Sequence, residues 1–263
     1  MSDLTMNDVD LGSLNTATKY PSIPTYHRLD PKNGGLVEEP TAFTDVVHIS
    51  EKLDGTNSRI IQFPNGDYIL GSREELLHAS GDLIANPALG IVEALRPLAE
   101  RLTPPSAGIR VLFLEVYGGK VTGASKQYTG TRAVGHRLFD VATIPVGVVL
   151  GWPQARISTW REDGGQIFFT RGGELEDFAQ DQKIDLVPDL GVIAADALPT
   201  SIEETQVFLS DLLPTTQAGL DDSAGGAPEG IILRTTDRSV IAKARFQDYR
   251  RTLNRRASGR KNT

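Results

Sequence analysis

The chain has 263 residues, of which 39% are hydrophobic and 23% charged, which is ordinary for a globular protein with a sizeable core. It contains no cysteine, which excludes disulfides and thiolate metal sites. No stretch approaches the roughly 20 apolar residues of a membrane span, and the acidic, polar N-terminus is unlike a signal peptide. We therefore expect a cytoplasmic protein that has no membrane partner.

The N-terminal part is predicted to be irregular. Residues 1–18 are polar and are predicted to be disordered, and the prolines and glycines of residues 19–36 are typical of a covering segment without regular structure. Regular structure is predicted to begin near Asp45. A strand is expected at 46–53, followed by a hairpin whose strands, 58–63 and 67–72, are joined by an Asn-Gly turn.

The middle of the chain combines a helix with further strands. Apolar residues between Asp82 and Leu102 recur at helical spacing, which predicts a helix with a break at Pro87. Two buried strands are predicted at 109–118 and 136–144, and the apolar run 146–152 is expected to continue the sheet.

The C-terminal third begins with two predicted helices, at 174–182 and 202–213, separated by a loop. A second loop at 215–228 leads into two strands, at 230–235 and 239–244, and a basic helix is expected at 246–257. Because strands and helices are mixed without a regular βαβ alternation, the pattern predicts an α+β fold.

The charge is unevenly distributed. The net charge is −7, but residues 243–261 contain eight basic residues and one acid, so this segment carries +7 and the remainder −14. A basic end on an acidic body favours contact with a polyanion, although a solvated tail would have the same composition. The residues expected to make this contact are Arg250, Arg251, Arg255 and Arg256.

The heptapeptide EKLDGTN, residues 51–57, is the most informative segment. It places Lys52 at the end of an apolar strand, immediately before an Asp-Gly turn that would hold the lysine rigidly. Burial and nearby cations can lower the pKa of a lysine enough to make its amine a nucleophile. A surface lysine before a turn is the simpler alternative.

This heptapeptide resembles motif I, Lys-x-Asp-Gly, of the covalent nucleotidyltransferases, which comprise ATP-dependent DNA ligases, RNA ligases and mRNA capping enzymes. The flanking Glu51 and Thr56-Asn57 are closer to the RNA ligase 2-like branch. Five further segments resemble the other motifs of that superfamily in the same order. Their key residues are Arg73 (motif Ia), Glu115 (III), Phe139 (IIIa), Glu229 (IV), and Lys243 with Arg245 (V). Each residue alone could be merely structural, but the six motifs in order cover residues 50–245.

The resemblance implies a ligase adenylation domain of mostly antiparallel sheets flanked by helices. It further implies an ATP-dependent RNA ligase that carries AMP on Lys52 and joins 5′-phosphate and 3′-hydroxyl RNA ends. Phe139 would stack on adenine, Glu51 would contact the adenine edge, and the ribose and phosphates would be held by Asn57, Arg73, Lys243 and Arg245. Asp54, Glu115 and Glu229 would serve Mg²⁺ or Mn²⁺, through the waters of the ion if not directly.

Two departures from the family pattern bear on these expectations. RNA ligases commonly have lysine where this chain has Arg245, and arginine differs from lysine in shape and in its fixed charge. Only 18 residues follow Arg245, so the expected domain spans residues 19–246, with a basic tail at 247–263 and no downstream OB domain.

Three alternatives stay open from the sequence. The chain could be another lysyl-nucleotidyltransferase, such as a DNA ligase or a guanylyltransferase. It could also be a non-catalytic protein that binds nucleotides or RNA ends, or an unrelated acidic protein with a basic tail. Retention of Lys52 favours an enzyme, because binding alone needs no nucleophile. An end-healing enzyme is a possible partner.

Overall fold

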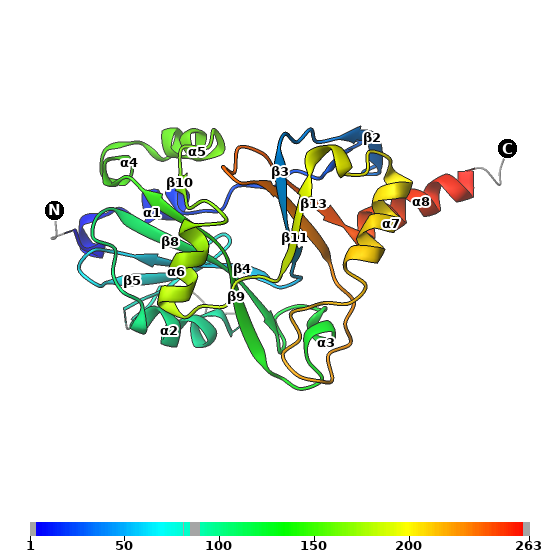
Figure 1. The fold of residues 1–263 in the computed structure, drawn as a ribbon. Coiled ribbons are helices and arrows are strands. Elements are labelled where there is room, and N and C mark those ends of the chain that lie inside the picture. The colour runs from blue at the N-terminus through cyan, green and yellow to red at the C-terminus, as the bar shows by residue number, and fades with distance from the viewer. Residues whose placement is uncertain (1–3, 81, 85–89, 260–263) are drawn as a thin grey trace.

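The structure is a computed structural model that describes residues 4–80, 82–84 and 90–259. Two antiparallel sheets lie side by side (Figure 1). In spatial order the larger sheet consists of β10 (Ile167–Phe168), β9 (Val134–Ile144), β8 (Ile109–Gly118), β4 (Thr56–Gln62), β5 (Tyr68–Ser72), β6 (Leu76–Ala79) and β7 (Asp82–Leu83). The smaller sheet consists of β11 (Asp189–Ala194), β3 (Val46–Lys52), β12 (Gly230–Thr235) and β13 (Ile241–Arg245). The expected α+β fold is confirmed.

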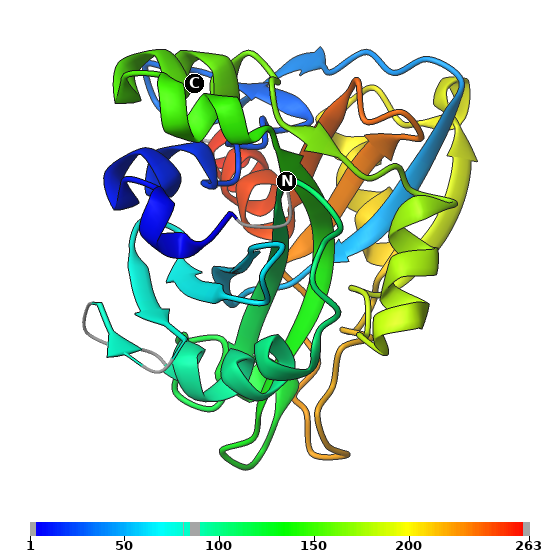
Figure 2. The ribbon, with the colours of Figure 1, turned by 90° about the vertical axis from the view of Figure 1, so that its left-hand side faces the viewer.

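Helices cover both faces of the larger sheet (Figure 2). On one face pack α2 (Ile91–Arg101) and α6 (Glu174–Gln182), and on the other α1 (Leu11–Ala17), α4 (Val146–Gly151) and α5 (Gln154–Glu162). Because successive strand residues point to opposite faces, Ile60 faces the first layer and Ile61 the second. A strand buried on both faces needs a continuous apolar run, which explains why these adjacent isoleucines are both inaccessible to solvent.

The smaller sheet buries one face against α7 (Ile202–Leu212) and α8 (Phe246–Gly259). A short hairpin, β1 (His27–Leu29) and β2 (Leu36–Pro40), packs against the same helices. The remaining elements among the described residues are α3 (Ser125–Tyr128) and two 3₁₀ turns, Met6–Asp8 and Ala195–Ala197. In the described parts of the chain, no helix has the length and apolar content needed to span a bilayer.

The expected disorder of residues 1–18 is wrong for residues 4–18, while residues 1–3 lie outside the described residues. Asp10 caps α1 by accepting a hydrogen bond from the Ser13 N–H at 2.7 Å. Leu14 and Ala17 are fully buried against the larger sheet. A seven-residue amphipathic helix of this kind is stabilised by packing and not by its own propensity, so a polar composition does not exclude it.

Four other expectations need correction. The covering segment 19–36 was expected to be irregular and regular structure to begin near Asp45, but β1 lies within this segment and β2 also precedes Asp45. The helix predicted from Asp82 starts only at Ile91, after Gly90 with a positive φ of 69°, and the break expected at Pro87 lies outside the described residues. The run 146–152 forms α4 and not a strand, and the loop predicted between α6 and α7 contains β11. A short apolar run such as 146–152 fits a buried helix and a buried strand equally well. The other predicted strands and helices are present.

Candidate active site

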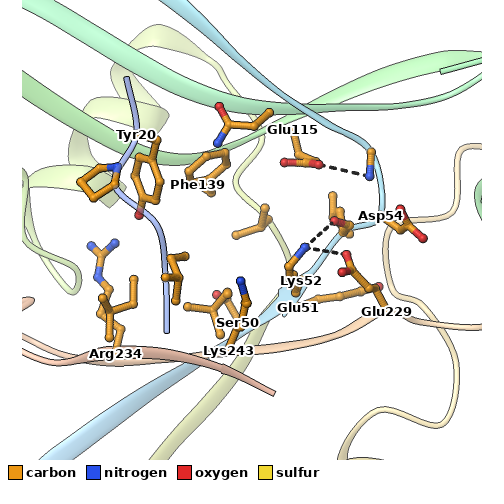
Figure 3. Close-up of a pocket in the computed structure, with 18 of the residues that line it drawn as sticks. Tyr20, Ser50, Glu51, Lys52, Asp54, Glu115, Phe139, Glu229, Arg234 and Lys243 are labelled. Carbon is orange, nitrogen blue, oxygen red and sulfur yellow. Dashed lines mark hydrogen bonds and ion pairs between the residues drawn. The ribbon is translucent and has the colours of Figure 1, made fainter. Parts of the chain in front are cut away.

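A pocket of about 380 Å³ lies where the two sheets meet (Figure 3). Strand β3 of the smaller sheet ends at Lys52, and after residues 53–55 the chain enters β4 of the larger sheet. The smaller sheet lines the pocket from β3, β12 and β13, and the larger sheet from β4, β8 and β9. The lysine is therefore fixed at the crossing point of the two sheets.

The turn after Lys52 is held by hydrogen bonds from its own backbone to two side chains. The Asp54 N–H donates to the Tyr128 hydroxyl at 2.6 Å, and the Gly55 N–H donates to Glu115 Oε1 at 3.1 Å. Any Cβ at Gly55 would collide with the Val116 carbonyl oxygen, so only glycine allows this close approach to β8. The glycine of the heptapeptide thus has a steric cause.

Lys52 Nζ donates to Glu229 Oε2 at 2.6 Å and more weakly to the Leu53 carbonyl at 3.4 Å (Figure 3). The lysine side chain is 25% exposed and that of Glu229 14%. Burial raises the pKa of Glu229, although the charge of Lys52 opposes this rise. The carboxylate therefore orients the amine in the pocket and lies within proton-transfer distance of it.

Four carboxylate residues are among those that line the pocket, and three of them, Asp54, Glu115 and Glu229, are the ones expected to serve a metal ion. Burial raises the pKa of Glu115 to about 7, with further contributions from the charges of Glu229 and Asp54. Within the described residues, no group of three His, Asp or Glu side chains is placed to hold one ion directly. The expectation that all three carboxylates ligate one ion directly is therefore wrong, whereas contact through the waters of an ion stays a prediction.

Cations face these carboxylates. Lys243 lines the pocket, and its pKa is lowered by burial and by the nearby charges of Arg245, Lys52 and Arg73. Arg73 also lines the pocket but is 60% exposed and lies 3.4 Å from Glu74. Asn57 on β4 completes the polar wall.

Phe139 lines the pocket because of a bulge. Phe113 pairs with Asp140 and Leu114 with Leu138, which leaves Phe139 as the extra residue of β9. Its ring meets Tyr20 edge-on, at 5.0 Å between centroids. Sequence reasoning missed Tyr20, which lines the pocket from the covering segment 19–36.

A buried network fixes Tyr20. Its hydroxyl donates to Asp140 Oδ2 at 2.8 Å and accepts from Arg238 Nη2 at 2.7 Å. Asp140 is fully buried and also pairs with Arg234 at 3.3 Å and with Arg238 at 2.8 Å. Both arginines belong to the smaller sheet and its β12–β13 turn, so the network ties that sheet to β9 and to the covering segment.

Residues 45–246 match the family model described as RNA ligase. The chain belongs to the RNA ligase family. Among curated proteins, no sequence match to the chain was found.

Several structures of the Naegleria gruberi RNA ligase have a similar fold. An apo lysine mutant has a TM-score of 0.57 at 15% identity and covers 89% of this chain and 57% of that one. A second lysine mutant, with ATP and Mn, has a TM-score of 0.56 at 14% identity, with 89% and 58% covered. The ligase with pyrophosphate has a TM-score of 0.55 at 15% identity, with 89% and 57% covered. This chain therefore spans less than two thirds of those ligase chains.

Two residues expected from the RNA ligase family pattern make other contacts in the structure. Glu51 is among the residues that line the pocket, but it is only 1% exposed and accepts from the Thr216 hydroxyl and from the Gln217 N–H at 2.8 Å. Both of its carboxylate oxygens therefore hold the 214–218 loop, and its contact with an adenine edge stays a prediction. Arg245 is not part of the pocket wall, and its Nε donates to Asp248 at 2.8 Å.

The basic helix expected to bind RNA is attached to the fold by three of its four arginines. Arg251 and Arg255 donate to the carbonyls of Gly34 at 2.7 Å and of Asn33 at 2.6 Å. Arg256 pairs with Glu38 at 2.6 Å and with Glu203 at 3.1 Å. Arg250 is exposed and makes no ion pair or side-chain hydrogen bond within the described residues. The solvated-tail alternative is thus wrong for residues 246–258, which form an anchored helix.

Proposed function

We propose that this chain is the nucleotidyl-transfer part of an ATP-dependent RNA ligase that acts through a covalent AMP adduct on Lys52. The proposal is carried mainly by one observation. The described side chains from motifs scattered over 190 residues of sequence converge on one pocket around the Lys52 amine. Family membership supports the same activity, as do the ATP and Mn named for the similar Naegleria ligase structures.

In the proposed first step, Lys52 Nζ attacks the α-phosphorus of ATP and pyrophosphate leaves. Glu229, 2.6 Å from the amine and with a raised pKa, accepts the amine proton. Lys243 and Arg73 supply positive charge to the phosphates, and Asn57 is available to the ribose. Phe139 and Tyr20 form the aromatic wall for adenine.

Mg²⁺ or Mn²⁺ would offset the negative charge that develops at the α-phosphate. Asp54, Glu115 and Glu229 would hold such an ion through its waters, which suits Mg²⁺ because this ion gives up its water reluctantly. The partly protonated state of Glu115 near pH 7 makes the charge of this set sensitive to pH.

In the later steps AMP passes to the 5′-phosphate of an RNA strand, and a 3′-hydroxyl then displaces AMP to seal the ends. This chemistry implies a role in RNA repair, with an end-healing enzyme as the partner that prepares the ends. The basic helix α8 is proposed to contribute phosphate contacts, with Arg250 the arginine best placed to do so.

The first test is the intact mass of the purified protein after incubation with ATP and the metal ion. We expect a gain of one AMP, and we expect Lys52→Ala and Lys52→Arg both to abolish it. Neither variant provides a neutral amine at this point, while Lys52→Arg retains the positive charge. Circular dichroism should show that both variants remain folded.

An adduct that survived in either variant would identify a different nucleophile. Labelling by GTP in place of ATP would instead indicate a guanylyltransferase, and transfer to nicked DNA but not to RNA would indicate a DNA ligase. Absence of any adduct from the folded wild-type protein would favour a non-catalytic binding protein.

A further inference from the structure

A second cavity, of about 590 Å³, adjoins the active-site pocket. We call it the Arg28 cavity, and its walls include Arg28, Leu29, Glu39, Pro40, Lys243 and Arg245. We propose that this cavity holds the 5′-terminal nucleotide of the RNA strand that accepts AMP. This inference rests on the proposed function and adds the path by which the second substrate reaches Lys52.

Lys243 connects the two spaces. The covering segment runs alongside β13, where the Lys243 N–H donates to the Pro24 carbonyl at 2.9 Å and the Tyr26 N–H donates to the Lys243 carbonyl at 2.8 Å. Lys243 lines both the pocket and the Arg28 cavity, so a phosphate beside its amine lies at the boundary between them.

The charge of the Arg28 cavity suits a phosphate. Three cations and one acid, Glu39, are among its walls. Arg28 pairs with Glu39 at 2.6 Å and Arg245 with Asp248 at 2.8 Å, while Lys243 makes no ion pair among the residues described by the structure. A half-buried amine without a counter-ion favours an incoming anion.

A third cavity, which adjoins the pocket beside Tyr20, is less suitable. Its cations Lys19, Arg73 and Arg161 each pair with Glu74 or Glu162, and both of these acids line the same cavity. It also meets the pocket at the aromatic wall and not at Lys243. An RNA phosphate arriving there would approach the base of the nucleotide and not its phosphate.

The Arg28 cavity also offers apolar surface. Leu29 is 39% exposed, and Ile23, Pro24 and Pro40 also line this cavity. Such a surface accommodates a ribose or a base without reading its hydrogen-bonding edge, which suits an enzyme that must accept ends of differing sequence.

This site would serve the transfer of AMP from Lys52 to RNA. In this step an oxygen of the RNA 5′-phosphate attacks the phosphorus of the Lys52 adduct and forms a phosphoanhydride bond. The phosphorus–nitrogen bond breaks, and the lysine amine leaves with the electron pair and takes up a proton. Lys243 would position the attacking phosphate, and Arg28 on the outer wall would contact the strand.

The test uses two opposed variants of one ion pair. Arg28→Ala removes the cation, and we expect about a tenfold slower transfer of AMP from the preformed adduct to a limiting 5′-phosphorylated oligoribonucleotide. Glu39→Gln removes the competing acid and should make the transfer faster. A merely structural role for the pair would move both variants in the same direction. Arg96→Ala and Glu100→Gln are the matched controls, since this pair has the same separation within 0.1 Å and is similarly exposed.

Binding of the 5′-phosphorylated oligoribonucleotide, measured without ATP, should be weaker than wild type in Arg28→Ala and tighter in Glu39→Gln. In Arg28→Ala the salt dependence of this binding should fall by about one counterion. Adduct formation from ATP and its reversal by pyrophosphate should be unchanged in all four variants. A change in these ATP-dependent rates would assign the cavity to the phosphates of ATP and overturn the proposal. An effect of Lys19→Ala on transfer, with Arg28→Ala equal to its control, would also overturn it by placing the strand in the cavity beside Tyr20. Failure of the wild-type protein to form an adduct would instead refute the proposed function.

Discussion

Phe139 shows how one residue of backbone irregularity brings an aromatic side chain into the wall of a pocket. The bulge in β9 turns its ring out of the regular alternation and towards the pocket, where Tyr20 supports it edge-on. We expect Phe139→Ala to weaken adduct formation by about 1–3 kcal/mol, taking base stacking on aromatic side chains as the guide. Phe139→Tyr and Phe139→Trp should be milder, since both keep an aromatic face.

The measurement for Phe139 is the ATP dependence of adduct formation, with circular dichroism as the control for folding. Phe139 also contacts Phe113, at 6.3 Å between ring centroids, so a contribution to the core is a real alternative. If Phe139→Ala loses its fold, or keeps full ATP affinity where it remains folded, the ring belongs to the core.

Glu115 predicts a specific dependence of stability on pH. Its pKa in the folded protein is about 7, above the ordinary 4.5, because burial disfavours the carboxylate. The folded state therefore favours the protonated form. Its contribution to stability is complete below about pH 4.5 and is lost as the pH rises through 7. Glu115→Gln cannot ionise, and its side-chain oxygen can still accept from the Gly55 N–H.

We therefore expect Glu115→Gln to unfold at a higher temperature than the wild type at pH 8, and this advantage should shrink towards pH 5. Thermal unfolding of both proteins at the two pH values, without ATP or metal, measures the difference. An advantage that stayed constant or grew towards pH 5 would contradict the raised pKa of Glu115.

At the scale of residues, the sequence predicted best those positions that depend on local geometry. Lys52 and Gly55 are neighbours in one strand and turn, so the heptapeptide itself contains their arrangement. Glu51 lines the pocket as expected, but its hydrogen bonds go to Thr216 and Gln217, which lie 165 and 166 residues away and which no local pattern reveals. Tyr20 was beyond local reasoning, since its position depends on Asp140 and Arg238, which are 120 and 218 residues away.

At the scale of elements, α1 is the clearest difference from expectation. Leu14 is fully buried beneath it and belongs to the core on that face of the larger sheet, whereas Leu11 of the same helix is 42% exposed. Leu14→Ala should lower the free energy of unfolding by about 2–4 kcal/mol, through lost burial and the cavity that remains. Leu11→Ala is the matched control and should cost well under 1 kcal/mol.

Urea denaturation of the two variants measures these costs. Equal and small effects would mean that residues 11–17 do not pack in solution, as their polar composition first suggested. The sequence could not decide this point, because two buried apolar residues in a short helix give no clear periodicity. Strands such as β4 and β8 were predictable, since long apolar runs between turn residues have few other solutions.

At the scale of the whole molecule, the two sheets are joined at both ends of the pocket. The chain itself crosses between them after Lys52, and the Asp140 network ties them beside Phe139. The pocket therefore has its shape before any ligand arrives, which favours positioning as the main source of rate acceleration. This joining of distant segments could not be predicted from the sequence, because no local pattern pairs Asp140 with the β12–β13 turn.

The anchored α8 changes how contact with RNA should be tested. Replacing all four arginines would mix two effects, because Arg251, Arg255 and Arg256 attach the helix to residues 33–38 and to Glu203. Arg250 and Arg256 separate these effects, since the first is free of such contacts within the described residues and the second pairs with two glutamates. We expect Arg250→Gln to leave unfolding and adduct formation unchanged while weakening RNA binding and reducing its salt dependence by about one counterion.

Arg256→Gln should instead lower the unfolding temperature slightly, because a half-exposed double ion pair contributes little, and should change RNA binding less than Arg250→Gln does. Fluorescence titration with an oligoribonucleotide at several salt concentrations, beside thermal unfolding, separates the two outcomes. If Arg250→Gln binds RNA as the wild type does, the charge of α8 serves the fold alone. The strand would then be held by the cavities around Lys52 without help from the C-terminal helix.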